Sequence, residues 1–255
     1  MTATQSTRTD FGESLPRVVL KTGEEDRVIA GHPWIYAASV ERVSPNATDG
    51  CVVRVLDRHR KFVGVGLYNS RSKINVRVLA LEDVPIDAGF FAKRIEEALA
   101  VRRRYMPGAG CFRVVNSEGD FLSGLIVDKY DDVLVLQTSA LGMDQRQDMI
   151  VEVLRSGLSP RAILARNDIS TRKLEGLPET SGVLWGQNPG EITVKLHKLL
   201  FTVDLLKGHK TGLYLDQQLN YGLVSDLVAK RPGARVLDCF CFTGGFGLHA
   251  AEAGA

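Results

Sequence analysis

The 255-residue sequence has no apolar run long enough to cross a membrane, and it contains no internal repeat or low-complexity tract. Its first residues are polar and have no apolar signal core, so export is not expected. Its four cysteines form neither a disulfide framework nor a CxxC metal pair. These absences predict a cytoplasmic protein with no membrane partner and no metal site. The composition, 44% hydrophobic and 24% charged, is typical of a globular protein with a sizeable core.

Basic side chains are concentrated in one part of the chain. Residues 51–80 hold seven Lys and Arg but only one acid, a formal charge of +6 on a chain whose total is +2. A local basic module on a near-neutral chain favours a polyanionic partner, nucleic acid first, although a solvated strand face would give the same pattern. The candidate RNA-binding residues are Arg54, Arg58, Arg60, Lys61, Arg71, Lys73 and Arg77.

The order of short apolar runs predicts a multidomain chain. Residues 15–83 hold short strand-like runs separated by Gly, Asn, Pro and Ser, which indicates a small antiparallel β-barrel or sandwich. Residues 84–110 are expected to form a linker helix, with Asp87 as its N-cap. Residues 111–204 mix strands with one helix, which predicts a central α+β domain that includes a hairpin at 191–206.

The last segment, residues 205–255, contains the pattern around which the chain is organised. Val236 to Asp238 predicts a buried strand, Thr243-Gly244-Gly245 a tight turn, and a helix should start near Phe246. Strand, glycine turn and helix form the opening unit of a Rossmann-like α/β domain. A parallel sheet needs further strands beside the first, so this domain is expected to be incomplete.

Longer motifs carry a resemblance to a known family. The strings SEGDFLSGLIVDKYDDVLVLQ, ARNDISTRKLEGL, GHKTGLYLDQ and DCFCFTGGFG begin at Ser117, Ala165, Gly208 and Asp238. Together with a PUA-like N-terminal module, they resemble the N-terminal portion of the RlmI-like class I S-adenosylmethionine-dependent rRNA (cytosine-5) methyltransferases. The string that begins at Gly208 is the most specific of them. The family usually has Arg where this chain has Gln218.

The resemblance implies a fold, a cofactor and a substrate. It implies an RNA-binding PUA barrel, a central α+β domain and the start of a Rossmann-like methyltransferase domain. The expected activity is transfer of a methyl group from S-adenosyl-L-methionine to carbon-5 of a cytosine in large-subunit rRNA. The residues that the resemblance assigns to the cofactor are Lys210, Thr211, Tyr214, Asp216, Gln217, Asp238, Phe240, Phe242, Thr243, Gly244 and Gly245.

The catalytic residues are not expected within this sequence. The family chemistry needs a cysteine thiolate that adds to carbon-6 of the base. Cys239 and Cys241 are expected to pack beneath the glycine turn rather than to act as nucleophiles. We therefore expect an N-terminal fragment that is inactive alone, and whether it forms a homodimer stays open.

Two other functions compete with the methyltransferase. The alternative of a different class is a non-catalytic RNA-binding module of the PUA type. A dehydrogenase is a distant third, because the glycine turn lacks the GxGxxG spacing.

Overall fold

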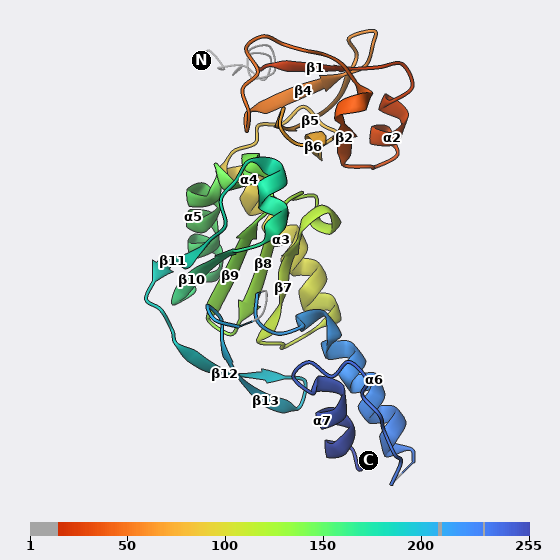
Figure 1. Cartoon of the computed structure of the whole chain (residues 1–255), viewed down its shortest axis with the longest axis vertical. Coiled ribbons are helices and arrows are strands. Elements are labelled where there is room, and N and C mark those ends of the chain that lie inside the picture. The colour runs from red at the N-terminus through yellow and green to blue at the C-terminus, as the bar shows by residue number, and fades with distance from the viewer. Residues whose placement is uncertain (1–14, 209–210, 232) are drawn as a thin grey trace, which may run out of the picture.

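The computed structural model describes residues 15–208, 211–231 and 233–255. The chain forms three parts that follow one another along the long axis of the molecule (Figure 1). A six-stranded sheet lies at the N-terminal end, a five-stranded sheet with helices lies in the middle, and a hairpin with two helices lies at the C-terminal end. No helix in this described part of the chain is both long and apolar enough to span a bilayer.

The N-terminal sheet has the strand order β2-β6-β5-β4-β1-β3. Every pair is antiparallel except β1 and β4, which run parallel, so the prediction of a purely antiparallel module is wrong at that pair. A short helix, which the sequence pattern did not predict, follows β1. The elements are β1 (Arg17–Leu20), α2 (Glu25–Ile29), β2 (Trp34–Tyr36), η1 (Ala37–Ser39), β3 (Val40–Val43), β4 (Val52–Leu56), β5 (Phe62–Tyr68) and β6 (Ile74–Ala80).

Alternation along these strands gives the N-terminal sheet an apolar inner face. Val18, Val53 and Val55 are fully buried in one cluster with residues of β2, β5 and β6. Successive side chains of a strand point to opposite faces, so the residues between them face outward. In β5, Gly66 lies so close to the backbone of Arg77 that any side chain there would overlap the neighbouring strand. The two glycines of β5 therefore allow close strand approach.

The central part is a five-stranded sheet of order β11-β10-β9-β8-β7, in which only β9 and β10 pair in parallel. Two long helices cover one of its faces. The elements are α3 (Ala88–Tyr105), β7 (Cys111–Asn116), η2 (Ser117–Asp120), β8 (Leu125–Tyr130), β9 (Val133–Thr138), α4 (Leu141–Asp144), α5 (Gln147–Leu158), β10 (Ala162–Asn167), η3 (Ser170–Glu175) and β11 (Thr180–Gly186).

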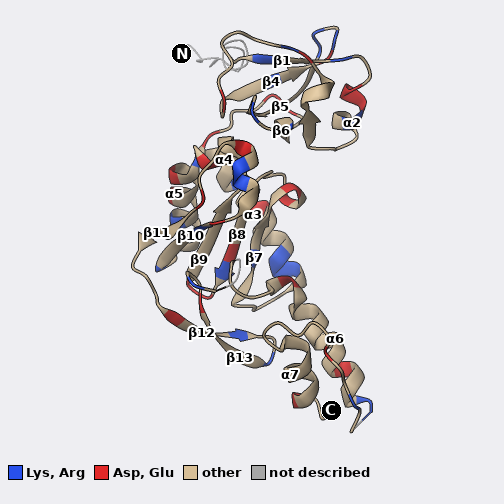
Figure 2. Ribbon diagram, in the orientation of Figure 1, with Lys and Arg blue, Asp and Glu red and all other residues tan. Residues whose placement is uncertain are grey.

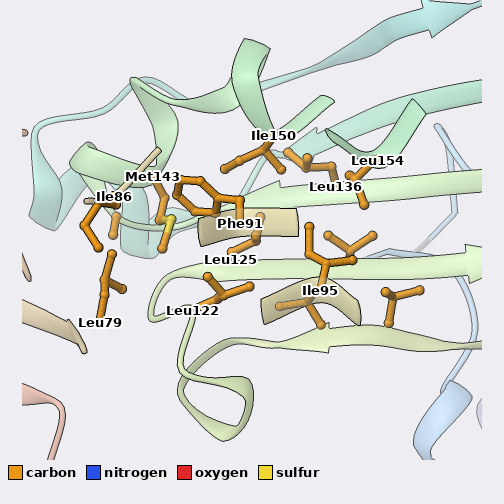
Figure 3. Close-up of a cluster of buried hydrophobic side chains, with 14 of the residues drawn as sticks. Leu79, Ile86, Phe91, Ile95, Leu122, Leu125, Leu136, Met143, Ile150 and Leu154 are labelled. Atoms are coloured by element: carbon orange, nitrogen blue, oxygen red, sulfur yellow. The ribbon is translucent and has the colours of Figure 1, made fainter. Parts of the chain in front are cut away.

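Helix α3, expected as a linker, forms a layer of the central domain. Asp87 accepts a hydrogen bond from the Phe90 amide at 2.9 Å, which confirms it as the N-cap. Phe91 and Ile95 are buried against Leu125 and Leu136 of the sheet (Figure 3). Apolar residues at helical spacing thus give the helix a buried stripe along the sheet. The domain limits at 83 and 110 stay predictions.

A separate hairpin, β12 (Glu191–Leu196) with β13 (Leu199–Asp204), confirms the two strands expected from the alternating run. Its inward residues, among them Val194 and Phe201, are buried with Tyr130 and Val135 of the central sheet. This cluster lies on the sheet face opposite α3 and α5, because neighbouring strand residues such as Leu134 and Val135 belong to different clusters. The hairpin therefore closes the second face of the sheet.

The C-terminal part consists of η4 (Leu215–Gln217), α6 (Gln218–Ala229) and α7 (Gly245–Glu252). The helix expected from Phe246 is present, but the strand expected at Val236 to Asp238 is not. Leu237 is 85% exposed, and residues 233–244 form no strand. A strand is defined by hydrogen bonds to a neighbouring strand, and the described residues place none beside this segment. An apolar run alone therefore predicted the wrong structure here.

A buried polar contact joins the N-terminal sheet to the central domain. Glu175 of η3 accepts hydrogen bonds from Asn69 at 2.9 Å and Ser72 at 2.5 Å, and pairs with Arg77 at 2.9 Å. Burial by itself would raise the pKa of Glu175, but the hydrogen bonds from Ser72 and Arg77 bring it below its usual value. Trp34 extends the contact by donating from Nε1 to Glu118 at 2.9 Å. The two domains are thus fixed to each other.

Candidate cofactor pocket and nucleic-acid interface

The segment after Gly208 is attached to the central sheet by a buried carboxylate. Asp128 of β8 is fully buried and accepts two hydrogen bonds from the Arg113 guanidinium of β7, at 2.8 and 3.0 Å. It also accepts one from Thr211 Oγ1 at 2.7 Å. Burial by itself would lower the pKa of Arg113, but the Asp128 hydrogen bonds raise it. Asp128 therefore holds Thr211 with the strength of a hydrogen bond to a charged group, about 1.5–3 kcal/mol.

Tyr130 fixes the same segment two residues further on. Its hydroxyl accepts from the Leu213 amide at 2.8 Å and lies 3.3 Å from the Leu213 carbonyl, to which it donates. Between these anchors Gly212 has φ +120°, and a Cβ there would lie 2.6 Å from the Tyr130 hydroxyl oxygen. Both the dihedral angle and the close approach require glycine. The backbone from Thr211 to Leu213 is therefore set by β8.

Arg166 holds the start of this segment. It is 4% exposed on β10, and its guanidinium donates to the Leu205 carbonyl at 2.7 Å and to the Gly208 carbonyl at 2.8 Å. Asp168 accepts two further bonds from it, each 3.0 Å. The Asp168 pKa lies below its usual value, chiefly because of these Arg166 hydrogen bonds. Strands β8 and β10 thus position both sides of the segment.

A hollow of about 720 Å³ opens between this segment and the central sheet. Its walls include four of the residues expected at the cofactor: Thr211, Tyr214, Asp216 and Phe242. The rings of Tyr214 and Phe242 meet edge to face, with centroids 4.9 Å apart. Apolar walls, aromatic rings and a few polar groups are the features of a small-molecule pocket. The structure therefore brings two segments far apart in the sequence to one candidate site.

Asp216 and Gln217 stand at the start of α6. The Asp216 carboxylate accepts from Gln217 Nε2 at 2.7 Å, and no side chain caps the helix. Asp216 therefore does not act as the N-cap of α6, and its exposed carboxylate lines the hollow instead. Gln218 is buried and donates to the Cys111 carbonyl at 2.7 Å, so it ties α6 to the edge of the central sheet.

The glycine turn packs against α6. Gly244 has φ +76° and precedes α7, and a Cβ on Gly245 would lie 2.5 Å from the Tyr221 hydroxyl oxygen. Asp238 accepts a hydrogen bond from the Gly247 amide at 3.2 Å, within the first turn of the helix. A carboxylate at that position stabilises a helix start, so Asp238 has a structural role at the start of α7. Thr243 is exposed beside them.

Not every expected cofactor residue reaches the hollow. Phe240 is 97% exposed and is absent from its walls. The other expected residues that do not line the hollow are Gln217, Asp238, Thr243, Gly244 and Gly245. Lys210 lies outside the described residues. The assignment of these residues to a cofactor stays a prediction.

Cys239 and Cys241 are both exposed, so the expectation that they pack beneath the turn is wrong. The physical reason is the missing strand pairing, which leaves this stretch without a covering layer. Neither cysteine is among the residues that line the hollow. By contrast Cys111 is fully buried in β7, and burial raises its pKa to about 11.

The seven basic residues expected to bind RNA do not form one surface. Arg58, Arg60 and Lys61 are exposed at the β4–β5 turn, whereas Arg71 and Lys73 are exposed at the β5–β6 turn. The seven residues of β5 separate the two groups by roughly 20 Å, at about 3.3 Å per residue. Figure 2 likewise shows blue ribbon dispersed over the molecule rather than gathered on one element.

Two of the seven are engaged within the protein. Arg77 pairs with Glu175 at 2.9 Å and Glu118 at 3.6 Å, and its side chain is 12% exposed. Arg54 pairs with Asp83 at 2.6 Å and lies over the Phe62 ring. Both guanidiniums are thus engaged by carboxylates of the protein itself, and their assignment to RNA stays a prediction.

Sequence reasoning missed the residues that position the pocket: Arg113, Asp128, Tyr130 and Arg166. One signal was available. Asp128 directly follows the apolar residues Leu125, Ile126 and Val127, in a run that predicts a buried strand. A charged side chain in such a run requires a partner, because an unpaired buried carboxylate is costly. The partners themselves could not be found without the fold.

Comparison with known proteins first identifies the class of the N-terminal part. A family model for a PUA-like domain matches residues 18–81. This confirms the expected PUA-like module, which is followed by the further domains described above.

Curated relatives match almost the whole chain. It is 37% identical over 243 residues to "Ribosomal RNA large subunit methyltransferase I" of Shewanella amazonensis, and 38% identical over 246 residues to the protein of the same name in Shewanella denitrificans. Each match covers 94% of this chain and 61% of the relative. The chain thus spans about 61% of the length of these relatives, and the resemblance read from the motifs is confirmed.

Solved structures share the fold. One titled "A putative sam-dependent methyltransferase from Streptococcus mutans" superposes with a TM-score of 0.75 at 19% identity, covering 94% of this chain and 61% of that one. Another, a putative methyltransferase complexed with SAH, gives a TM-score of 0.78 at 21% identity, covering 94% and 60%. The multidomain architecture is therefore that of known structures.

Proposed function

We propose that this chain takes part in S-adenosyl-L-methionine-dependent methylation of RNA, with carbon-5 of a cytosine in large-subunit rRNA as the target. One observation supports it most: the hollow that joins Tyr214 and Asp216 to Phe242, on a chain similar over 94% of its length to rRNA methyltransferases. In this proposal Thr211, Tyr214, Asp216 and the turn at Gly244 contact the cofactor. When bound, S-adenosylmethionine supplies an electrophilic methyl group.

The residues of this chain would bind and orient rather than react. Tyr214 and Phe242 offer aromatic faces to a flat heterocycle, and Asp216 offers a carboxylate to its polar groups. Among the described residues that line the hollow there is no cysteine. We therefore propose that the chain binds cofactor and RNA but does not turn over by itself. It would act in the cytoplasm.

The second candidate is an RNA-binding module without catalysis. The absence of a thiol among the described walls of the hollow favours it. Isothermal titration with S-adenosylmethionine, alongside a methyl-transfer assay on rRNA, separates the candidates. Cofactor binding without turnover supports the first proposal, and RNA binding without any cofactor binding supports the second. Turnover would contradict the inactivity proposed above. Size-exclusion chromatography with light scattering decides whether a homodimer forms.

A further inference from the structure

A second hollow, of about 400 Å³, lies on the outer face of the N-terminal sheet. It is lined by arginines from three places in the sequence: Arg17 of β1, Arg42 of β3 and Arg60 of the β4–β5 turn. Its floor includes Val19 and Leu56, and no acidic residue is among the residues that line it. In the sequence Arg17 and Arg42 lie outside the basic segment, so charge counting alone did not find them.

Strand register explains how the arginines meet. Val19 pairs with Arg42 of β3 and with Leu56 of β4. Residues that pair directly across strands point to the same face, and residues two apart on one strand share that face. Arg17, Val19 and Arg42 therefore share the outer face. Val18 lies between them and belongs to the buried cluster on the inner face.

Arg60 reaches the same hollow from a turn. It has φ +65°, and its amide donates to the Asp57 carbonyl at 3.0 Å. The Asp57 carboxylate accepts from the Lys61 amide at 2.7 Å, which fixes the turn. A tight turn with a left-handed residue thus places a third guanidinium beside the sheet.

These arginines differ in their pairing from the buried or half-buried arginines that hold the domains together. Arg77, Arg102 and Arg172 each contact a carboxylate within the protein. Over residues 15–208, 211–231 and 233–255, no ion pair is found for Arg17, Arg42 or Arg60.

The arrangement of these arginines is expected to lower the stability of the N-terminal sheet. Arg17 also stands directly opposite Arg54 on β4. Like charges placed opposite each other destabilise a sheet. Three guanidiniums around one hollow, without an acid among its walls, are suited to an anion from outside.

We propose that this hollow binds neighbouring phosphates of a single-stranded RNA segment, with one base against Val19 and Leu56. That the ligand is RNA rests on the proposed function. The present proposal adds the place on the N-terminal sheet where the RNA is bound. Guanidiniums match phosphate oxygens bidentately, which favours a phosphate chain over a protein carboxylate surface. An apolar floor can contact the face of an unpaired base but not that of a base stacked within a duplex.

The position of the hollow gives it an anchoring role. Strands β1 and β4 lie at the opposite end of the molecule from α6, whose Leu219 lines the cofactor hollow (Figure 1). A strand held at Arg17 and Arg42 would extend over the central domain before it reached Tyr214. The hollow would therefore contribute affinity and register rather than chemistry.

The test measures RNA affinity of the full chain without any cofactor. A labelled single-stranded RNA of about 10 nucleotides is titrated by fluorescence anisotropy at 50 and 200 mM salt. The variant is Arg17→Gln with Arg42→Gln. The matched control is Lys195→Gln with Lys230→Gln, which removes the same charge from two exposed residues elsewhere.

Two lost phosphate contacts should lower the log–log salt slope by about 1.4, since each contributes about 0.7 for single strands. The affinity difference between wild type and variant should thus shrink about sevenfold from 50 to 200 mM. The control pair should leave the slope within error of the wild type. If both double variants lowered the salt slope equally, the proposal would be overturned. The RNA would then be attracted by the overall positive charge of the protein rather than bound at this hollow.

Two further measurements test whether the variant folds and which class of ligand the hollow binds. Arg17→Gln should keep or raise the melting temperature, because it removes the like charge opposite Arg54. Duplex RNA and an acidic peptide should compete more weakly than the single strand. Tighter binding of either competitor would reject single-stranded RNA as the ligand. Because no cofactor is present, failure here leaves the methyltransferase proposal untouched, and failure of cofactor binding leaves this result untouched.

Discussion

Thr211 donates from Oγ1 to the buried carboxylate of Asp128 at 2.7 Å, across 83 residues of sequence. The contact joins the segment most specific to the resemblance with strand β8 of the central sheet. It follows that the central domain positions one wall of the candidate cofactor site.

Thr211→Val keeps the shape of the side chain and removes its hydrogen bond. Asp128 then loses one of three donors, and the contact to a charged acceptor is worth about 1.5–3 kcal/mol. Hydrogen exchange should show faster exchange at residues 211–217, and any cofactor affinity should fall. Thr193→Val is the matched control, because the Thr193 hydroxyl meets Thr202 on an exposed hairpin face. Equal exchange rates at residues 211–217 in the two variants would show that Thr211 does not anchor this segment.

Gly212→Ala should disturb the pocket wall more strongly. The new Cβ would lie 2.6 Å from the Tyr130 hydroxyl oxygen, at a φ of +120°. Strain of this kind costs about 1–3 kcal/mol. Tyr130→Phe removes the oxygen that the methyl group meets but also the hydrogen bonds to Leu213. The double variant should therefore cost less than the sum of the two single variants. Gly190→Ala, with φ +65° and open space around it, should cost clearly less. Urea unfolding of these variants provides the comparison.

The sequence predicted those parts whose pattern is local. The helix over residues 88–105, its N-cap and the hairpin at 191–206 depend on spacing and capping within a few residues, and the structure has them. The strand at Val236 was wrong because strands need partners, and those cannot be read from the run itself. The parallel pairing of β1 with β4 is also a property of the whole sheet.

The residues of the candidate site also divide into those that the sequence predicted and those that it did not. The motif pattern placed Tyr214 and Phe242 at a cofactor, and the structure brings their rings together. Arg77 was taken for a surface residue, because charge along the sequence does not reveal a partner about 100 residues away. Glu175 is that partner, and its contact with Arg77 depends on how the N-terminal sheet packs against the central domain.

The domain contact at Glu175 should weaken in acid. Its pKa is lower in the folded protein than its usual value of about 4.3, so its stabilising contribution is complete above that pH. The contribution is lost as pH falls through the folded-state pKa. Glu175→Gln should cost about 3 kcal/mol near neutral pH, since it removes the nearer carboxylate of Arg77 and leaves only Glu118, 3.6 Å away.

Unfolding midpoints between about pH 6 and pH 3 provide the measurement. The wild type should lose more stability across this range than Glu175→Gln, so the two curves approach each other in acid. Glu82→Gln, at an exposed loop acid, should run parallel to the wild type. If the curve for Glu175→Gln stays parallel to that of the wild type over this pH range, the charge of the carboxylate contributes nothing to the domain contact.

Three of the four cysteines should react in two classes, and the half-buried Cys51 should fall between them. Cys239 and Cys241 are exposed, whereas Cys111 is fully buried and its pKa is raised to about 11, by burial first and by Asp131 second. Only the thiolate attacks an alkylating reagent. At about pH 8 a maleimide should modify Cys239 and Cys241 rapidly, and Cys111 only on unfolding. Mass spectrometry of the peptides identifies each site.

Replacing both exposed cysteines by Ser should abolish the fast phase and leave the melting temperature unchanged. The same experiment tests their distance from the pocket. Neither residue lines the cofactor hollow, so S-adenosylmethionine should not slow their modification. Protection by the cofactor would contradict this placement, because it would put a thiol beside the methyl donor and return Cys239 or Cys241 to consideration as the nucleophile.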